Sequence, residues 1–113
     1  MKTLNPSSLR HRVEIQRKAQ TQDPNTGEII TEWVKLADVW ASVEPLSARE
    51  FIAAQAGQSE ITARIVTRYR NDIDAAMRIL FRGKRYNIHG ALPDADSGLE
   101  YLTLPVSEGI SDD

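Results

Sequence analysis

Cysteine is absent from the 113 residues of this sequence. A chain without cysteine has no disulfide framework and no thiolate metal site, which favours a reducing compartment over a secreted, disulfide-stapled scaffold. Long apolar runs are missing as well: no window approaches the ~20 apolar residues of a membrane span, and the first twelve residues hold no run of signal-peptide length. We therefore expect a soluble protein with no membrane partner.

Residues that usually carry chemistry are few and scattered. His11 and His89 stand in no ligand-spaced cluster with carboxylates, so each is more simply a strand residue than a metal ligand. The glycines occur singly and build no phosphate-binding loop, and no serine has the surroundings of a nucleophile elbow. Carboxylate pairs do occur, but in expected turns where aspartate is favoured for backbone reasons: Asp72 with Asp74, and Asp94 with Asp96. We predict no enzyme, no metal and no cofactor.

Alternation of apolar and polar residues is the main pattern that the sequence does have, and it predicts β-strands. Residues 9–17 and 38–44 alternate with a period of two, and residues 28–36 are rich in β-branched and aromatic side chains. Turn formers within residues 18–27 predict a hairpin with a long loop between the first two strands. Pro45 should end the third strand, because proline has no backbone N–H to donate.

Further strands are predicted at residues 60–70, 77–81, 85–92 and 99–106, with a turn at Arg82-Gly83-Lys84. The fold class is therefore mainly β, and a small antiparallel β-barrel of about six or seven strands is the simplest way to avoid exposed sheet edges. A chain of this length suits one domain. We divide it into an N-terminal arm (1–8), the barrel domain (9–106) with an inserted segment at 46–59, and an acidic C-terminal tail (107–113).

One short helix is predicted in the central strand connection, over residues 48–56. Ser47 and Glu50 have capping-box spacing, and Gly57 stands where a left-handed helix stop would lie. Nine residues are too few for a stable isolated helix, so this one must be docked to persist. Because Phe51 and Ile52 sit among alanines, the apolar surface wraps most of the helix, which favours contact with a second chain; the alternative is a plug over the open end of its own barrel.

Basic residues gather in the middle of the chain. Residues 60–90 hold seven basic and three acidic side chains, whereas residues from 94 onward hold six acids and no base. Arg64, Arg68 and Arg70 share one face of the predicted strand, with Tyr69 on the other. The pattern is compatible with a charged partner or a nucleic acid, and equally with a solvated strand face.

The order of the segments resembles the tailed-bacteriophage head-tail joining family, which includes head-closure, stopper and head-tail adaptor proteins. The resemblance spans residues 9–106 and is carried by LRHRVEIQR, then VWASVEPLSARE, then the strand ARIVTRYR and the hairpin MRILFRGKRYNI. It implies a homo-oligomeric ring below the portal and adaptor that closes the DNA-filled head and offers the tail a docking surface, with double-stranded DNA passing through without sequence recognition. It also implies a location in the virion, and in the host cytoplasm during assembly.

Two other functions stay open: a tail terminator or completion ring, and a small barrel that binds nucleic acid. The family carries no catalytic motif, so only segments can be transferred. Its mid-chain connection reaches the DNA channel or a neighbouring subunit, and here that connection is residues 46–59. The predicted interface or channel-facing residues are Ser47, Arg49, Glu50, Phe51, Ile52, Gln55 and Gln58, and the predicted inter-ring or DNA-facing residues are Arg64, Arg68 and Arg70.

Overall fold

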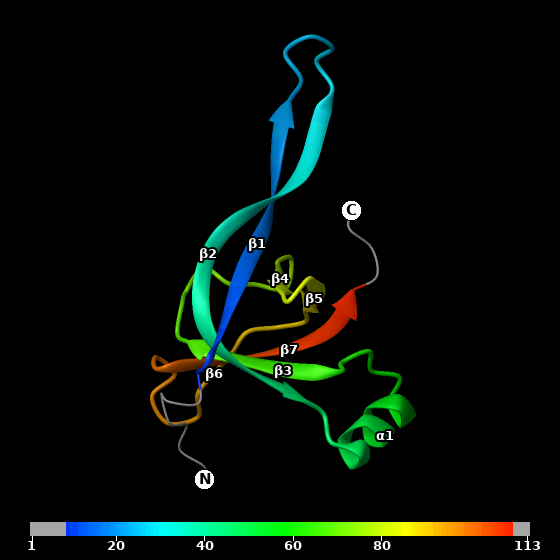
Figure 1. Cartoon of the computed structure of the whole chain (residues 1–113), viewed down its shortest axis with the longest axis vertical. Coiled ribbons are helices and arrows are strands. Elements are labelled where there is room, and N and C mark those ends of the chain that lie inside the picture. The colour runs from blue at the N-terminus through cyan, green and yellow to red at the C-terminus, as the bar shows by residue number, and fades with distance from the viewer. Residues whose placement is uncertain (1–8, 110–113) are drawn as a thin grey trace.

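The structure, a computed structural model, describes residues 9–109 of the chain (Figure 1). The predicted arm at 1–8 and residues 110–113 of the predicted tail lie outside this range. The described part contains one helix, α1 (Ala48–Ala56), and seven strands: β1 (His11–Gln22), β2 (Ile29–Pro45), β3 (Ala63–Arg68), β4 (Arg78–Phe81), β5 (Lys84–Ile88), β6 (Leu92–Pro93) and β7 (Tyr101–Gly109). No helix within residues 9–109 is long and apolar enough to span a membrane.

The strands form a single antiparallel sheet that closes on itself. The strand order is β3-β2-β1-β4-β5-β7, and β7 pairs back onto β3, so six strands complete a ring, while β6 pairs with the beginning of β7. The prediction of a mainly β, antiparallel fold with about six or seven strands is confirmed. Closure satisfies the backbone of these strands and leaves the ring without a free edge.

The core lies inside the closed sheet and consists mainly of branched aliphatic side chains. Ile15 pairs across the strands with Ile79, and Ile65 with Leu104, and all four are fully buried. Thr67 is also inaccessible on the same face of β3. The alternation predicted for this strand is therefore correct on its core side.

A long hairpin projects from one end of the closed sheet. β1 pairs with β4 only at residues 14–16 and β2 pairs with β3 only at residues 41–45, so residues 17–22 and 29–34 pair with one another alone. We call residues 17–35 the projecting hairpin. It gives the described molecule an extent of 56 Å along its longest axis (Figure 1). The loop predicted at 18–27 is shorter than expected, because pairing continues to Gln22 and Ile29.

The two strands predicted at 28–36 and 38–44 are one strand, β2. Ile15 pairs with Ala37 and Gln16 with Lys35, so Leu36 is an extra residue without a partner, which is a β-bulge. The bulge shifts the phase of the apolar alternation by one residue. The pattern therefore looks like two strands although the pairing is continuous.

Other strands also begin or end at residues that differ from the predicted ones. β3 is shorter than the predicted 60–70, and the predicted strand at 85–92 divides into β5 and the two-residue β6. β7 begins later than predicted and continues through Ser107 and Glu108 to Gly109, because these residues pair with β5. The predicted boundary between barrel and tail at residue 106 therefore falls inside a strand.

The hairpin between β4 and β5 turns at two residues, Arg82 and Gly83, both with positive φ (52° and 79°). Lys84 already belongs to β5. This is the primed type of turn, in which asparagine followed by glycine is favoured. Arginine at the first position is strained, because its side chain is disfavoured in the left-handed region.

We expect Arg82→Asn to raise the free energy of unfolding by about 0.5–1 kcal/mol and the melting temperature by about 2–6 °C, because asparagine adopts this conformation at lower cost. Thermal and urea unfolding measure this, with Gly83→Ala as the control of opposite sign; two unchanged melting temperatures would contradict it.

Candidate assembly surfaces

The capping of α1 follows the prediction at its start and differs at its end. Ser47 Oγ accepts a hydrogen bond from the Glu50 backbone N–H at 3.2 Å, and the Ser47 N–H donates to Glu50 Oε1 at 3.1 Å, which confirms the capping box. Gly57 has φ −87°, so it is not the left-handed residue. That residue is Gln58 (φ 61°), whose N–H bonds Gln55 O, while the Ser59 N–H bonds Ala54 O. This is a Schellman stop with glutamine in place of glycine.

No side chain of α1 is buried by the described part of the chain. Phe51 is 43% exposed and Ile52 67% exposed, and the helix stands out from the closed sheet beside the beginning of β3 (Figure 1). A helix of this length gains most of its stability from packing. Residues 9–109 thus build a well-capped helix with apolar side chains that they do not bury.

An ion pair ties α1 to β3. Arg64 Nη1 lies 2.7 Å from Glu50 Oε2, and Nη2 lies 3.4 Å from Oε1. The hydrogen bond from Arg64, reinforced by the Ser47 N–H, lowers the pKa of Glu50 from 4.5 to about 2. The same carboxylate therefore caps the helix and fixes it to the neighbouring strand.

This pKa shift predicts that α1 loosens in acid. Because the folded-state pKa lies below that of the unfolded chain, ionised Glu50 stabilises the helix above pH 4.5, and this contribution is lost as the pH falls toward 2. We expect the helical Cα and Cβ chemical shifts of residues 48–56 to decline over that interval. NMR titration measures this, and in Glu50→Gln the same shifts should stay constant. A wild-type titration that matches the Gln variant would show that the carboxylate does not hold the helix.

The three arginines predicted to share a face are held in different ways. Arg64 pairs with Glu50, as described; Arg68 lies over the Tyr101 ring, 5.5 Å from its centroid; and Arg70 forms two hydrogen bonds with Asp72, at 2.8 and 3.0 Å. Val66, between Arg64 and Arg68, is buried against Leu9 and Tyr101. The outer face of β3 is therefore not one continuous basic strip: Val66 separates Arg64 from Arg68 on it, and Arg70 lies beyond the end of the strand.

An open cleft of about 590 Å³ lies at the end of β3 that is remote from α1. Trp40 is 52% exposed in it, and the guanidinium of Arg12 lies 5.3 Å from the centre of a Trp40 ring. We call this surface the Trp40 cleft; its lining residues are Leu9, Val39, Trp40, Arg68, Tyr69 and Arg70. Sequence reasoning placed Tyr69 away from the arginines and did not include Trp40, whose approach to β3 depends on the pairing of β2 with β3.

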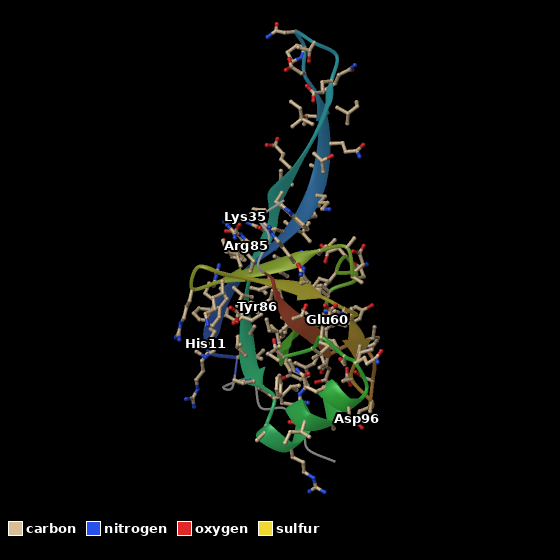
Figure 2. The ribbon with its side chains drawn as sticks, turned by 90° about the vertical axis from the view of Figure 1, so that its right-hand side faces the viewer. His11, Lys35, Glu60, Arg85, Tyr86 and Asp96 are labelled. Atoms are coloured by element: carbon tan, nitrogen blue, oxygen red, sulfur yellow. The ribbon has the colours of Figure 1, made fainter. Side chains whose placement is uncertain are left out.

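Both ends of the long axis expose apolar side chains. At the tip of the projecting hairpin, Ile29 is 59% and Ile30 40% exposed. Leu92 in β6 and Leu99 before β7 are exposed at the opposite end, as is α1 (Figure 1). Figure 2 shows the side chains of the hairpin standing clear of the closed sheet, with Lys35 near the point where the hairpin departs.

At its base, the projecting hairpin is anchored by stacked cations. Trp33 has the Arg78 guanidinium 4.3 Å and the Lys18 ammonium 5.3 Å from ring centroids. Arg78 is buried, and its Nε donates to Gln16 Oε1 at 2.7 Å. Cations over an indole ring hold its orientation. These contacts join residues far apart in sequence, which is why sequence reasoning did not find them.

The turn carboxylates that were considered as possible catalytic groups accept hydrogen bonds from the backbone. Asp94 accepts hydrogen bonds from the N–H groups of Ser97, Glu100 and Tyr101, and these hydrogen bonds lower its pKa. Asp74 accepts from the Ala76 N–H. The prediction that turn aspartates serve the backbone is confirmed for these two.

Both histidines contact neighbouring side chains of the fold. His89 Nε2 lies 2.8 Å from Ser107 Oγ, and His11 makes an edge contact with Phe81. Within residues 9–109, no three histidine or carboxylate side chains gather where they could hold a metal ion.

This geometry defines a class of protein: a mainly β, antiparallel protein with a closed sheet and exposed apolar side chains. The sequence pattern of the phage head completion proteins covers residues 4–109, and the chain belongs to that family. The predicted relationship to head-tail joining proteins is thereby confirmed. Family membership places the chain in the phage virion, as predicted.

Two curated relatives have the same description. The chain is 38% identical to head completion protein gp16 of Bacillus phage SPP1 over 72 residues, which are 64% of this chain and 65% of gp16, so less than two thirds of that relative is spanned. It is 28% identical to head completion protein gp7 of Enterobacteria phage HK97 over 92 residues, 77% of this chain and 81% of gp7.

Two solved structures have a similar fold. The solution structure of protein SF1141 from Shigella flexneri 2a has a TM-score of 0.77 at 38% identity, with 96% of this chain and 99% of that chain covered. A chain of the native gene transfer agent virion has a TM-score of 0.57 at 15% identity, covering 98% of this chain and 100% of that one. At 15% identity the second likeness shows the fold alone.

Proposed function

We propose that copies of this chain form a closed ring in the head-tail connector, below the portal and adaptor, where the ring closes the DNA-filled head and offers the tail a docking surface. The observation that carries the proposal is the exposure of apolar side chains at both ends of the long axis, at Ile29 and Ile30 and at Leu92 and Leu99. Exposed apolar patches commonly mark protein contacts. A subunit of a ring placed between two other rings needs such contacts at both ends.

The role proposed for the chain is structural and not enzymatic. Its candidate residues form contacts between subunits. Phe51 and Ile52 pack against a neighbouring copy, and Ser47 and Glu50 cap the helix that carries them. Arg49, Gln55 and Gln58 lie on the exposed surface of the same segment. Residues 46–59 thus supply a subunit contact or face the channel through which the double-stranded DNA passes.

The arginines take different parts in this proposal. Arg64 positions α1 through Glu50, whereas Arg68 and Arg70 are at the cleft and are available at its rim to acidic groups of another subunit or ring. Charged rims contribute to specificity and to the rate of association. Phosphates of the DNA are the lesser alternative for the same two side chains.

The ring is tested by imaging purified particles and by counting copies of the chain in them. We expect a closed ring between the portal stack and the tail, and deletion of the gene should yield filled heads that leak DNA or fail to join tails. A ring located at the far end of the tail tube would instead favour the tail terminator function. One or two copies per particle, or infectious particles without the chain, would refute the proposal. A salt-dependent DNA titration of the purified chain tests the nucleic-acid alternative.

A further inference from the structure

Helix α1 and the Trp40 cleft lie at opposite ends of one strand ladder. The helix leads through residues 57–62 into the first residue of β3, whereas the cleft contains Arg68, the last residue of β3. The ladder between β3 and β7 runs through six residue pairs, from Ala63 with Val106 to Arg68 with Tyr101, which is about 17 Å at ~3.4 Å per residue. One copy therefore cannot fill its own cleft with its own helix while this ladder persists.

The two surfaces are complementary in shape and polarity. The helix offers an aromatic and an aliphatic side chain, Phe51 and Ile52, and neither is buried within residues 9–109. The cleft offers a concave surface lined by Leu9, Val39 and the half-exposed Trp40, and its volume lies within the ~300–1,000 Å³ range of pockets that take up compact apolar groups. Tryptophan is one of the residue types enriched among the few residues that supply most of the binding energy of an interface.

The charges around the two surfaces are opposite in sign. Residues 44–60, which carry the helix, hold three acidic side chains and one basic one, and Arg64 pairs with one of the acids, Glu50, so the balance stays acidic by one charge. The cleft has Arg68 and Arg70 in its lining and Arg12 against Trp40, with Asp72 as the acidic neighbour of Arg70. An acidic surround on the helix side and a basic rim on the cleft side favour the approach of one to the other.

We infer that the Trp40 cleft of each copy receives helix α1 of the next copy, with Phe51 and Ile52 packed against Trp40. This rests on the proposed ring and names the contact that builds it. Because donor and acceptor surfaces differ and lie at opposite ends of the ladder, the contact is heterologous and repeats from copy to copy until the ring closes. It also explains why α1 is capped at both ends but uncovered: docking needs a helix that is already close to formed.

Photochemical cross-linking in assembled particles tests this contact. Phe51 is replaced by p-benzoylphenylalanine, which keeps an aromatic ring at the position, and purified particles are irradiated and digested with trypsin. The sequence separates helix and cleft into different tryptic peptides, residues 50–64 and residues 36–49. We expect a ladder of covalent oligomers of this chain alone, in which peptide 50–64 is joined to peptide 36–49 at or next to Trp40.

The controls separate failure of this contact from failure of the ring. Copy number and ring image are recorded before irradiation, so an absent ring is scored against the proposed function. A ring in which position 51 links to α1 of another copy, to its own chain, to a different protein or to nothing overturns the inference and leaves the ring intact. If the Phe51 variant does not assemble, p-benzoylphenylalanine at Trp40 tests the same contact from the other side, and its failure to join peptide 50–64 has the same meaning. At Ile29 the cross-linker should join neither peptide.

Discussion

Replacing Phe51 and Ile52 together by aspartate is expected to leave a folded chain that no longer enters particles. Neither side chain is buried on the single chain, with Phe51 43% and Ile52 67% exposed, so the free energy of unfolding should change by no more than about 1 kcal/mol. In the ring, each side chain would lose a burial of about 1.5–3 kcal/mol and add a buried charge. A loss of ~3 kcal/mol or more weakens one contact over 100-fold, and the loss recurs at every copy.

The measurement has two parts. Thermal unfolding of the purified variant reports on the fold, and complementation of a phage that lacks the gene reports on assembly, where titre should fall to the level of the deletion. Phe51→Leu with Ile52→Leu is the matched control, because it keeps the helix apolar and should restore titre. Full titre from the aspartate variant would mean that α1 is not a subunit contact.

The closed sheet could be anticipated from the sequence because its core obeys a simple rule. In β3, alternation with a period of two puts Ala63, Ile65 and Thr67 on one face, and all three are buried. Strand formation there needs no information from distant residues. The helix was predicted to the residue for the same reason, since Ser47, Glu50 and the residues between them are a local signal.

The projecting hairpin could not be anticipated because it obeys no such rule. Residues 18–22 are almost entirely polar, and pairing continues there from the adjoining part of the ladder although neither face of the ribbon is buried. The bulge at Leu36 then hides the continuity of β2 by shifting the phase of its pattern. A two-stranded ribbon without a covered face is only marginally stable in water, so a contact with another chain would stabilise the hairpin.

The sequence predicted only part of the candidate surfaces. Residues 46–59 were identified as a segment, but that Glu50 pairs with Arg64 depends on how the connection folds back onto β3. Position 58 offers no sequence signal, because glutamine rarely takes the left-handed conformation that it has here. The Trp40 cleft needs β2, β3 and Leu9 in place together, and pairings over such sequence separations are not visible in local patterns.

The second large effect is expected at the other end of the molecule, from Ile29→Asp combined with Ile30→Asp. These neighbours point to opposite sides of the ribbon tip and are exposed, so the closed sheet should unfold at an unchanged temperature. The tip is far from α1 and from β6, at the opposite end of the 56 Å axis. We therefore expect the variant chain to form its ring contacts but to lose the joint with the ring that the hairpin meets.

The composition of the particles distinguishes this result from that of the helix variant. With the hairpin variant, particles should accumulate that lack either this chain or the tail, depending on which neighbour binds the tip, whereas ring formation by the chain itself should persist. Gln20→Asp with Thr21→Asp places two charges at adjacent positions on the facing strand, where Thr21 pairs with Ile30, and removes no aliphatic side chain. If this control blocks joining equally, charge and not lost apolar contact is the cause. If the isoleucine variant joins heads to tails normally, the tip has no partner in the particle, and the exposed isoleucines no longer support a ring held from both ends.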